Sequence, residues 1–509
     1  MLSRTTPLRA GSRSLKLLAS LTSSYSSFPK ELLEVDESLG AKIRSSSSLK
    51  KPQFDFKFIT ANAESYAESA KLRNFSPHYV EGIKEIYPLY TKAKNDLNNF
   101  QARRSSIEAA FMPPKKKKGK KKSQNEGPAP VADFEKLNSK QKQEAMQKYL
   151  EELKQLKVEA KQLYEKVQEY ETTLMINGDM VPNLISPDSF IPEPEVVDML
   201  NDNDGARPVM AKDTDHVTVG KELGLIELDA ASRVSGSSWY YLTGNGALLE
   251  QALVNYALSK ARRRGYSPVI PPSIVRQEMA HACGFRPRDT NGEQQIYNLE
   301  DSDLCLTGTA EIPLAGLYSN AVIEFPKEGP NAGVKKHVGV SRSYRAEAGA
   351  RGRDTKGLYR VHEFTKVELF AWTDTKSRSV KVLEDILALQ KEIIFELGIT
   401  ARVLNMSPDE LGAPAYKKYD IEAWMPGRRD WGEVTSSSNC TDFQSRRMHT
   451  KYRNEEGKLV FVQTLNGTAM AVPRVIVAIL ETFYEPENKR VKIPEVLRKW
   501  MDDQEYISL

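Results

Sequence analysis

Two runs of apolar residues with a 3.5-residue repeat constrain the N-terminal third of this chain more than any other feature. The first run, interrupted only by Arg104, alternates steps of four and three through Tyr79, Ile83, Ile86, Tyr90, Ala93, Leu97, Phe100, Ile107 and Phe111. The second run keeps the alternation without a break through Tyr149, Leu153, Leu156, Ala160, Leu163, Val167, Tyr170 and Leu174. Such a repeat holds an apolar seam against a partner helix. Each run therefore predicts a long α-helix that packs on another helix.

The segment between the runs, residues 113–130, reads PPKKKKGKKKSQNEGPAP and cannot be helical throughout. Two heptad runs with a break between them predict an antiparallel helical hairpin over residues 50–180, with the lysine-rich segment at its tip. Each arm would be on the order of 45–50 Å long at about 1.5 Å per residue. Pro88 lies inside the first arm and predicts an irregular base. An oligomerising coiled coil is the alternative that heptads alone do not exclude.

The lysine-rich tip concentrates positive charge. The net charge of the chain is +5, but removing the seven lysines of residues 115–122 and the five basic residues of residues 1–30 turns it into −7. Any contact with a polyanion must therefore be local. A lysine run is compatible with a solvated loop, a targeting signal or a surface that contacts the phosphates of nucleic acid.

The first thirty residues are rich in Arg, Ser and Leu and contain no acidic residue before Glu31. This composition is typical of a mitochondrial transit peptide, and the apolar stretch is too broken for a secretory signal. We expect residues 1–30 to be a transit peptide and the protein to work in the mitochondrial matrix. An untargeted basic tail is the alternative.

The remaining length and composition indicate a multidomain globular protein. A chain of 509 residues exceeds the size of one ordinary core, so at least two folding units are expected. No apolar run is long enough to span a bilayer, so we expect no membrane insertion. The three cysteines, Cys283, Cys305 and Cys440, have no CxxC spacing and no neighbouring His cluster, and no zinc site is expected. Prolines and the polar stretch NDNDGARP predict a linker over residues 181–215, followed by a domain of mixed strands and helices over 216–509.

The stretch SRSYRAEAGARGRDTKGLYRVHEFTKVELFAW, residues 341–372, predicts two strands joined by a loop rich in Gly and Arg. Alternation in the second strand places Tyr359, Val361, Val367 and Leu369 on one side and His362, Phe364 and Glu368 on the other. Phe364 and Glu368 would be roughly 13 Å apart on their shared face. An aromatic ring can stack on a purine at one end, and a carboxylate can accept a hydroxyl hydrogen bond at the other.

This stretch resembles motif 2 of the class II aminoacyl-tRNA synthetases, in its seryl-tRNA synthetase form. Other segments resemble the same family in the same order: 234–253 and 266–275 its dimer region and motif 1, 306–320 its TAE element, 431–448 its metal and ATP segment, and 465–481 its motif 3. The resemblance covers nearly everything after residue 30. It implies an α+β fold, with a class II antiparallel β-sheet flanked by helices and an N-terminal coiled-coil hairpin that binds tRNA.

The resemblance also implies site residues. The implied ATP-binding residues are Arg345, Ala346, Glu347, Val361, His362, Glu363, Phe364, Glu433, Val434, Thr435, Ser436 and Arg474. The implied serine-binding residues are Thr309, Ala310, Glu311, Arg345, Glu368, Asn466 and Thr468. The resemblance implies that the catalytic residues are Arg345, Glu433 and Arg474, and that Glu433 and Ser436 would bind Mg²⁺.

Each implied role has a chemical rationale. Arg345 would bind the α-phosphate and the serine carboxylate. Glu347 would accept from the adenine amino group, while Phe364 and Arg474 would cover the two adenine faces. The sequence departs from the common pattern in three places, with Tyr344 where Phe is frequent and Ala469 and Pro473 where bacterial members often carry Gly.

The implied ammonium ligands of the serine substrate are Thr309 and Glu311, whereas its hydroxyl would lie among Glu368, Asn466 and Thr468. A site that hydrogen-bonds a substrate hydroxyl rejects alanine, because its own polar groups would otherwise stay unpaired.

The implied function is a serine–tRNA ligase, a homodimer whose partners are ATP, L-serine and tRNA(Ser). A catalytically inactive paralogue that acts as an RNA-binding or regulatory protein is the alternative, but such a paralogue is expected to lose some of Arg345, Glu368, Glu433 and Arg474. A purely structural coiled-coil protein would leave residues 306–481 unexplained.

The N-terminal segment yields a direct test. A fluorescent protein fused behind residues 1–30 is expected to enter mitochondria, because the segment combines basic, apolar and hydroxyl residues without acids. Microscopy of cells that express the fusion measures this. A fusion with Arg4, Arg9 and Arg13 changed to Glu should stay in the cytosol, and cytosolic retention of the unchanged fusion would contradict the targeting prediction.

Overall fold

The computed structural model describes residues 49–111, 139–211, 214–286, 295–347 and 356–509. The predicted transit peptide and the lysine-rich tip lie outside the described residues. In the described part of the chain, no helix is both long and apolar enough to cross a lipid bilayer. The three cysteines are free thiols and are buried.

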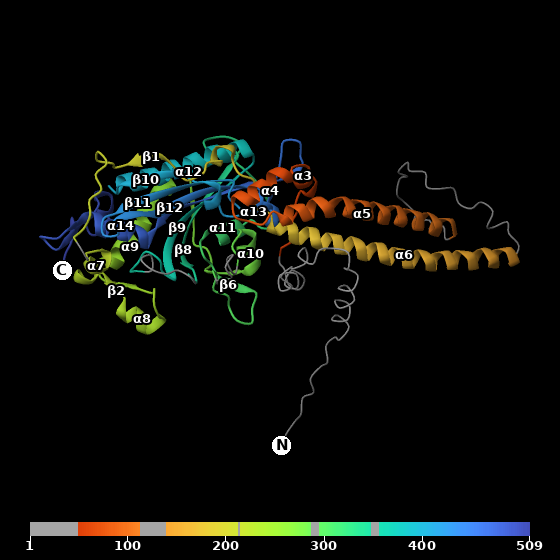
Figure 1. The fold of residues 1–509 in the computed structure, drawn as a ribbon, viewed down its shortest axis with the longest axis horizontal. Coiled ribbons are helices and arrows are strands. Elements are labelled where there is room, and N and C mark those ends of the chain that lie inside the picture. The colour runs from red at the N-terminus through yellow and green to blue at the C-terminus, as the bar shows by residue number, and fades with distance from the viewer. Residues whose placement is uncertain (1–48, 112–138, 212–213, 287–294, 348–355) are drawn as a thin grey trace, which may run out of the picture. The chain divides into compact units, whose positions relative to one another are not determined.

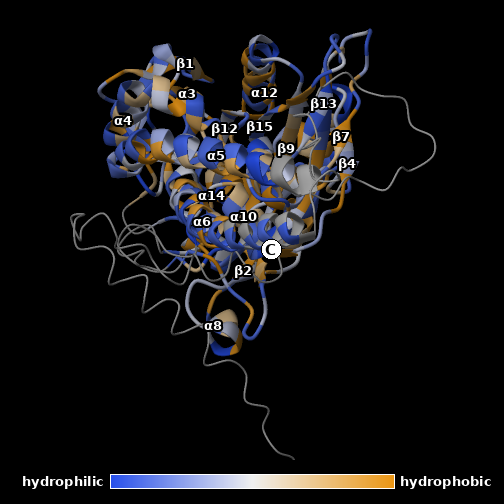
Figure 2. Ribbon diagram, turned by 90° about the vertical axis from the view of Figure 1, so that its right-hand side faces the viewer, coloured by the Kyte–Doolittle hydropathy of each residue, from blue (hydrophilic) through white to orange (hydrophobic). Residues whose placement is uncertain are grey.

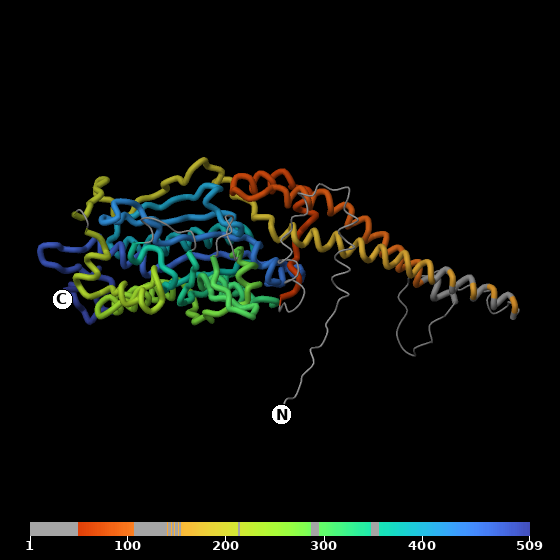
Figure 3. The backbone as a smooth tube through the Cα atoms, turned by 60° about the horizontal axis from the view of Figure 1, so that its bottom comes forward, coloured from red at the N-terminus to blue at the C-terminus, as the bar shows by residue number. Residues whose placement is uncertain are grey.

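The N-terminal part is built around two long antiparallel helices, α5 (His78–Phe111) and α6 (Ser139–Met180), which lie side by side in Figures 1 and 3. Two short helices, α3 (Phe56–Ala61) and α4 (Ala63–Leu72), precede them. Ile83 of α5 packs near Leu174 of α6, and Leu97 further along α5 packs near Val167. The residues that pack together therefore rise in number on one helix as they fall on the other, which makes the pair antiparallel.

Helix α5 continues through Pro88. A proline in a helix interior removes one backbone hydrogen bond, and the sequence predicted an irregular base for this reason. Helix α3 packs on this part of α5. The ring centroid of Phe56 lies 6.2 Å from that of Tyr87, the residue before Pro88. Tertiary packing of the apolar face therefore outweighs the missing bond.

The C-terminal part contains an eight-stranded sheet of order β1-β10-β11-β12-β15-β9-β8-β4. Its strands are β1 (Glu195–Leu200), β10 (Ala401–Asn405), β11 (Lys417–Met425), β12 (Asp430–Thr441), β15 (Gln463–Ala471), β9 (Glu363–Thr373), β8 (Val334–Tyr344) and β4 (Ser267–Val269). Neighbours pair antiparallel except β4 and β8, which pair parallel. Strand β1 comes from the segment that the sequence indicated as a linker.

Helices cover both faces of this sheet. On one face, α9 (Asn245–Arg263), α12 (Lys376–Glu396) and α14 (Val472–Phe483) form the main core with inward residues such as Val367 and Leu369 of β9. Figure 2 shows α12 beside β15. On the other face, α10 (Gln277–Ala282), α11 (Glu311–Gly316) and α13 (Phe443–Met448) enclose Phe370 and Trp372 in a second core. The α7 helix (His216–Glu222) packs on α14.

The remaining elements are short. They are the helices α8 (Asp229–Ser235) and α15 (Glu495–Arg498), the 3-10 helices η3 (Pro187–Ser189) and η5 (Pro408–Glu410), and the strands β2 (Ile226–Glu227), β3 (Tyr241–Leu242), β5 (Ile274–Arg276), β6 (Leu304–Leu306), β7 (Val322–Ile323), β13 (Lys451–Arg453), β14 (Leu459–Phe461), β16 (Tyr484–Glu485), β17 (Arg490–Lys492) and β18 (Tyr506–Ile507).

Candidate active site

Pairing register places polar side chains of neighbouring strands on one face of the sheet. Thr468 of β15 lies opposite Glu368 of β9, and Asn466 lies opposite Ser438 of β12. Residues two apart on a strand share a face, so Lys366 joins Glu368 on this side. The apolar residues between them, such as Val367, point to the main core. We call this side the polar face.

A β-bulge brings Glu433 and Ser436 onto the polar face together. Residues three apart on a regular strand point to opposite faces. Here the register shifts at Val434, so that Ser436 lies opposite Asp420 and Glu433 lies opposite Glu422. Asp420 and Glu422 are two apart and share a face, and therefore their partners do too. The extra residue, Val434, is buried in the main core.

The first group on this face is the carboxylate cluster, formed by Thr309, Glu311, Lys366, Glu368 and Asn466. The two oxygens of Glu311 accept hydrogen bonds of 2.7 Å from Gln444 Nε2 and 2.9 Å from Asn466 Nδ2. Lys366 Nζ donates to Thr309 Oγ1 at 3.1 Å and lies 2.5 Å from Glu368 Oε2. Glu368 is fully buried, and its Oε1 has no hydrogen-bond partner among the residues that the structure describes.

The electrostatics of this cluster favour a bound cation. Burial, and then the neighbouring Glu368 carboxylate, raise the pKa of Glu311 to about 7, against the opposing effects of Lys366, Gln444 and Arg345. Lys366 is the single cation in direct contact with either carboxylate of the cluster in the described part of the chain. A positively charged ligand group would therefore be stabilised beside Glu311.

The second group is the arginine cluster, formed by Arg345, Tyr359, Phe364, Glu433 and Arg474. Arg474 Nη1 lies 3.2 Å from Glu433 Oε2, Arg474 Nε donates to Tyr359 O at 3.3 Å, and the guanidinium lies 4.7 Å from the centroid of the Tyr359 ring. Arg345 lies over the Phe364 ring at 5.3 Å. The two rings and two guanidinium groups form flat surfaces of the kind on which a purine stacks.

Charge pairing holds the arginine cluster ionised. Burial alone would raise the pKa of Glu433, but Arg474, Lys418 and Arg345 lower it below its usual range. Burial and the charge of Arg474 lower the pKa of Arg345, and nearby carboxylates partly oppose this. The guanidinium groups of Arg345 and Arg474 are close enough for their charges to interact, and such a pair is suited to bind a polyanion.

Other residues predicted from the sequence line the ends of β8 and β9. His362 Nδ1 lies 3.0 Å from the Tyr297 hydroxyl and 3.1 Å from Arg345 O. Glu347, whose φ of 45° is in the left-handed region, lies 3.4 Å from Arg360 Nη1. Ala346 N donates to Gln295 O at 3.1 Å.

Some predicted residues offer no side chain to a ligand. The side chains of Ala310, Val361 and Val434 are buried in the apolar cores or beside them. The Thr435 hydroxyl donates to the carbonyl of Thr468. Glu363 begins β9, where its Oε1 lies 3.5 Å from the Tyr344 hydroxyl. These positions shape the strands that carry the site.

Sequence reasoning missed Lys366, Gln444 and Tyr359 as members of the site. Lys366 lies in the same alternation as Phe364 and Glu368, so the pattern itself could have found it. No signal in the sequence indicates Gln444, because its contact with Glu311 joins residues 133 positions apart.

The residues fit a Mg²⁺ ion that takes most of its ligands from phosphate and water. Glu433 and Ser436 offer the hard oxygen donors that Mg²⁺ prefers. Asp420 Oδ1, opposite Ser436, is buried and has no hydrogen-bond partner in the described ranges. In the part of the chain that the structure describes, no group of three or more His, Cys, Asp or Glu side chains is arranged to hold a metal.

Comparisons with known proteins agree with this geometry. The family model described as the tRNA synthetase class II core domain (G, H, P, S and T) matches residues 296–483. The mitochondrial serine–tRNA ligase of Saccharomyces cerevisiae is 45% identical over 471 residues, which cover 90% of this chain and 97% of that protein. The chain belongs to the seryl-tRNA synthetase family.

A second sequence relative and a solved structure agree with this assignment to the family. The mitochondrial serine–tRNA ligase of Schizosaccharomyces pombe is 53% identical over 291 residues, 56% of this chain and 58% of that protein. The crystal structure of the seryl-tRNA synthetase of Pyrococcus horikoshii complexed with ATP matches with a TM-score of 0.76 and 30% identity, over 89% of this chain and 99% of that one. The family, the enzyme class and the fold class inferred from the sequence are confirmed. Nothing in the comparisons favours an inactive paralogue.

The raised pKa of Glu311 makes the stability of the synthetase depend on pH. The folded protein holds this proton more tightly than the unfolded chain, so stability is lost as pH rises from about 4.5 through 7. Relative to a Glu311→Gln variant, the wild type should lose roughly 2–3 kcal/mol of unfolding free energy between pH 5 and 8. Chemical denaturation at several pH values measures the difference. If the unfolding free energies of the two proteins changed with pH in parallel, the raised pKa of Glu311 would be refuted.

Proposed function

We propose that the chain activates L-serine with ATP and transfers it to tRNA(Ser) for translation in the mitochondrial matrix. The observation that carries this proposal is the polar face, which presents a carboxylate cluster beside an arginine cluster. A cationic amino group fits the first and a nucleotide fits the second. The names of the two yeast relatives support a mitochondrial enzyme, and the basic N-terminal segment supports targeting.

In the proposed first step, a serine carboxylate oxygen attacks the α-phosphorus of ATP, and the bond to the bridging oxygen of pyrophosphate breaks. Arg345 belongs to the arginine cluster, where it lies over Phe364, and it is close enough to Glu433 and to Glu368 of the carboxylate cluster for their charges to act on it. Its guanidinium would stabilise the charge that develops on the α-phosphate. Mg²⁺ bound by Glu433 and Ser436 would neutralise the polyphosphate.

The carboxylate cluster supplies the proposed selectivity for serine. The ammonium group would lie beside Glu311 and Thr309. Glu368 Oε1 would accept the hydrogen of the serine hydroxyl and so gain the partner that it lacks among the described residues. Alanine offers no hydroxyl, so its binding would leave a buried acceptor unpaired.

In the second step, the terminal ribose hydroxyl of tRNA attacks the seryl carbonyl, and AMP leaves. The antiparallel pair α5 and α6 would bind the tRNA through shape and phosphate contacts. A homodimer is proposed as well. Exposed apolar residues near the predicted motif 1 support it, above all Ile270, which is 92% exposed, together with Ile274 and Val234.

Serine-dependent exchange of labelled pyrophosphate into ATP tests the function, and its absence with purified, folded protein would refute it. Glu368→Ala should reduce this exchange by at least about 10²-fold, because the hydroxyl loses its acceptor and Lys366 its partner. Glu384→Ala is the control. Glu384 lies on α12, which covers the opposite face of the sheet, and it accepts a hydrogen bond from the Tyr419 hydroxyl. Unchanged serine kinetics in Glu368→Ala would show that the serine site lies elsewhere.

The lysine-rich tip is testable separately. Deleting residues 113–130 and joining the arms with a neutral loop should weaken tRNA binding and reduce its salt dependence, because clustered lysines release counterions from phosphates. Pyrophosphate exchange should be unaffected. Filter binding across a salt series measures the affinity, and identical affinities with and without the segment would make it a linker only.

A further inference from the structure

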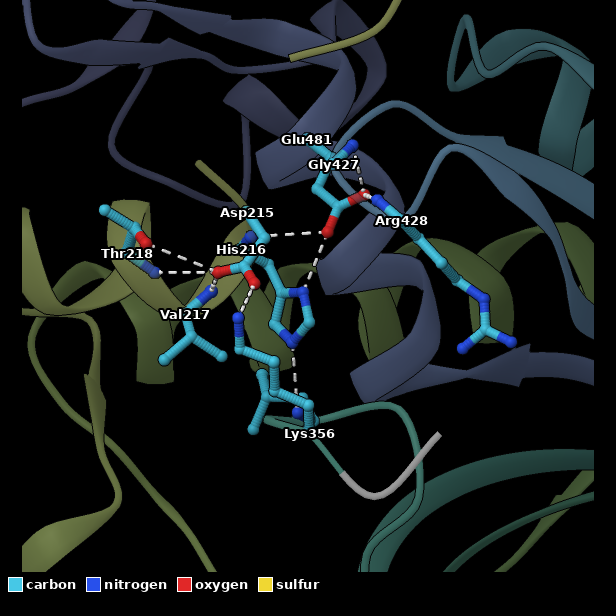
Figure 4. A network of polar contacts seen from close by, with 9 residues as sticks. Asp215, His216, Val217, Thr218, Lys356, Gly427, Arg428 and Glu481 are labelled. Carbon is cyan, nitrogen blue, oxygen red and sulfur yellow. Dashed lines mark hydrogen bonds and ion pairs between the residues drawn. The ribbon is translucent and has the colours of Figure 1, made fainter. Parts of the chain in front are cut away.

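A buried polar network outside the two clusters joins four separate segments of the chain (Figure 4). His216, the first residue of α7, lies with its Nδ1 2.8 Å from Glu481 Oε1 on α14, and both side chains are buried. Glu481 Oε2 accepts hydrogen bonds from the backbone N–H groups of Gly427, at 2.9 Å, and Arg428, at 3.1 Å, in the turn between β11 and β12. His216 N also donates to Glu481 Oε1 at 3.3 Å.

The second ring nitrogen of His216 reaches the segment that leads into β9. The backbone N–H of Leu358 donates to His216 Nε2 at 3.2 Å. Because an amide N–H is only a donor, Nε2 must be the acceptor, and the proton must be on Nδ1, where it is donated to Glu481. The network therefore requires one tautomer of the ring. Beside it, Lys356 forms an ion pair with Asp215, the residue that caps α7.

Two glycines allow the close approach. Gly357 has a φ of 68°, and a Cβ added there would lie 2.1 Å from His216 Nε2. A Cβ on Gly427 would lie 2.9 Å from Glu481 Oε1. Both loops are therefore packed directly on the histidine–carboxylate pair, and neither accepts a side chain without moving away from it.

Tyr359, the residue after Leu358, belongs to the arginine cluster. Its carbonyl accepts a hydrogen bond from Arg474 Nε at 3.3 Å, and the centroid of its ring lies 4.0 Å from the guanidinium group of Arg428 and 4.7 Å from that of Arg474. Arg428 also donates its backbone N–H to Glu481. Arg474 and Glu481 are seven residues apart on α14, two turns of the same helix. The helix thus contacts Tyr359 directly through Arg474 near its start, and it reaches Leu358 through His216, which Glu481 holds near its end.

We propose that His216 is a positioning residue for ATP, which acts by fixing Leu358 and Tyr359 so that the Arg474 guanidinium is presented to the nucleotide. The inference rests on the proposed function, because it assigns Arg474 to the ATP site. His216 itself touches no substrate, and its effect passes through the hydrogen bond from Leu358.

Two conservative variants of the full-length protein separate the two bonds of the ring. In His216→Asn, the amide group sits near the position of Nδ1 and can donate to Glu481, but the acceptor for Leu358 is lost. In His216→Gln, the longer side chain places an oxygen near the position of Nε2 and restores that acceptor. We expect His216→Asn to raise the Kd and KM for ATP about five- to tenfold, the effect of one lost hydrogen bond. The KM for serine should change less than about twofold, and His216→Gln should bind ATP close to wild type.

The readouts are ATP titration by calorimetry, which needs no catalytic turnover, and pyrophosphate exchange with each substrate varied. His337→Asn is a matched control, because His337 is a half-buried histidine that also forms a hydrogen bond. Its Nε2 lies 2.9 Å from the Tyr318 hydroxyl, and neither residue belongs to the segment 356–359. Unchanged ATP binding in His216→Asn would overturn the proposal. An equal loss in both His216 variants, or a parallel rise in the KM for serine, would also overturn it, because the residue would then act on the fold alone.

A second pair of variants tests the same contact if His216→Asn fails to fold. Gly357→Ala should weaken ATP binding to a similar extent by pushing the segment off His216. Gly457→Ala carries a similar backbone strain, with a φ of 77°, but a Cβ there meets nothing within 4 Å, so it should leave ATP binding unchanged. Equal ATP affinities for these two variants would refute the proposal. A wild type that binds ATP but shows no serine-dependent exchange would instead contradict the proposed function.

Discussion

The pairing register of β9 with β15 is the constraint on which the rest of the site depends. Thr468 lies opposite Glu368, and the intervening residues Val367 and Leu369 point into the main core. A slip by one residue would turn every side chain of β9 to the opposite face, so that Lys366 and Glu368 would enter the apolar core. The free-energy cost of burying those charges without partners excludes the alternative registers. One pairing therefore fixes both the core and the polar face.

The polar face is a place where charge is buried, and the partners found there explain how the fold tolerates it. Lys366 neutralises Glu368, and Arg474 neutralises Glu433, so each contributes attraction against the loss of hydration. Glu368 Oε1, like Asp420 Oδ1 and Gln444 Oε1, is buried without a hydrogen-bond partner among the described residues. Such an acceptor lowers the stability of the free protein, and a ligand hydroxyl would remove the cost. Stability and recognition are thus opposed at this atom.

The end of the helical pair and the carboxylate cluster are held by the same short helix. Asp179, in the last turn of α6, lies 3.4 Å from Arg447 Nε of α13 and 3.0 Å from Arg286 Nη1. Helix α13 also carries Gln444, which donates to Glu311. Burial opposes ionisation of Asp179, but its bonds to His281, Arg286 and Arg447 lower its pKa well below the usual range. The charge that anchors α6 is therefore strongly held.

Local periodicity determined much of this protein in advance. The heptads predicted α5 and α6, and alternation placed Phe364 and Glu368 on one face of β9, because both patterns report which side of a single element is apolar. The resemblance of several motifs in order gave the family. Periodicity does not report how elements are paired, so the shared face of Glu433 and Ser436 follows only from the bulge at Val434. The contacts of Glu311 with Asn466 and of His216 with Glu481 join residues 155 and 265 positions apart. Only the tertiary structure could decide them, because the energy that selects such pairs comes from burial and from strand register, neither of which is a property of any one segment.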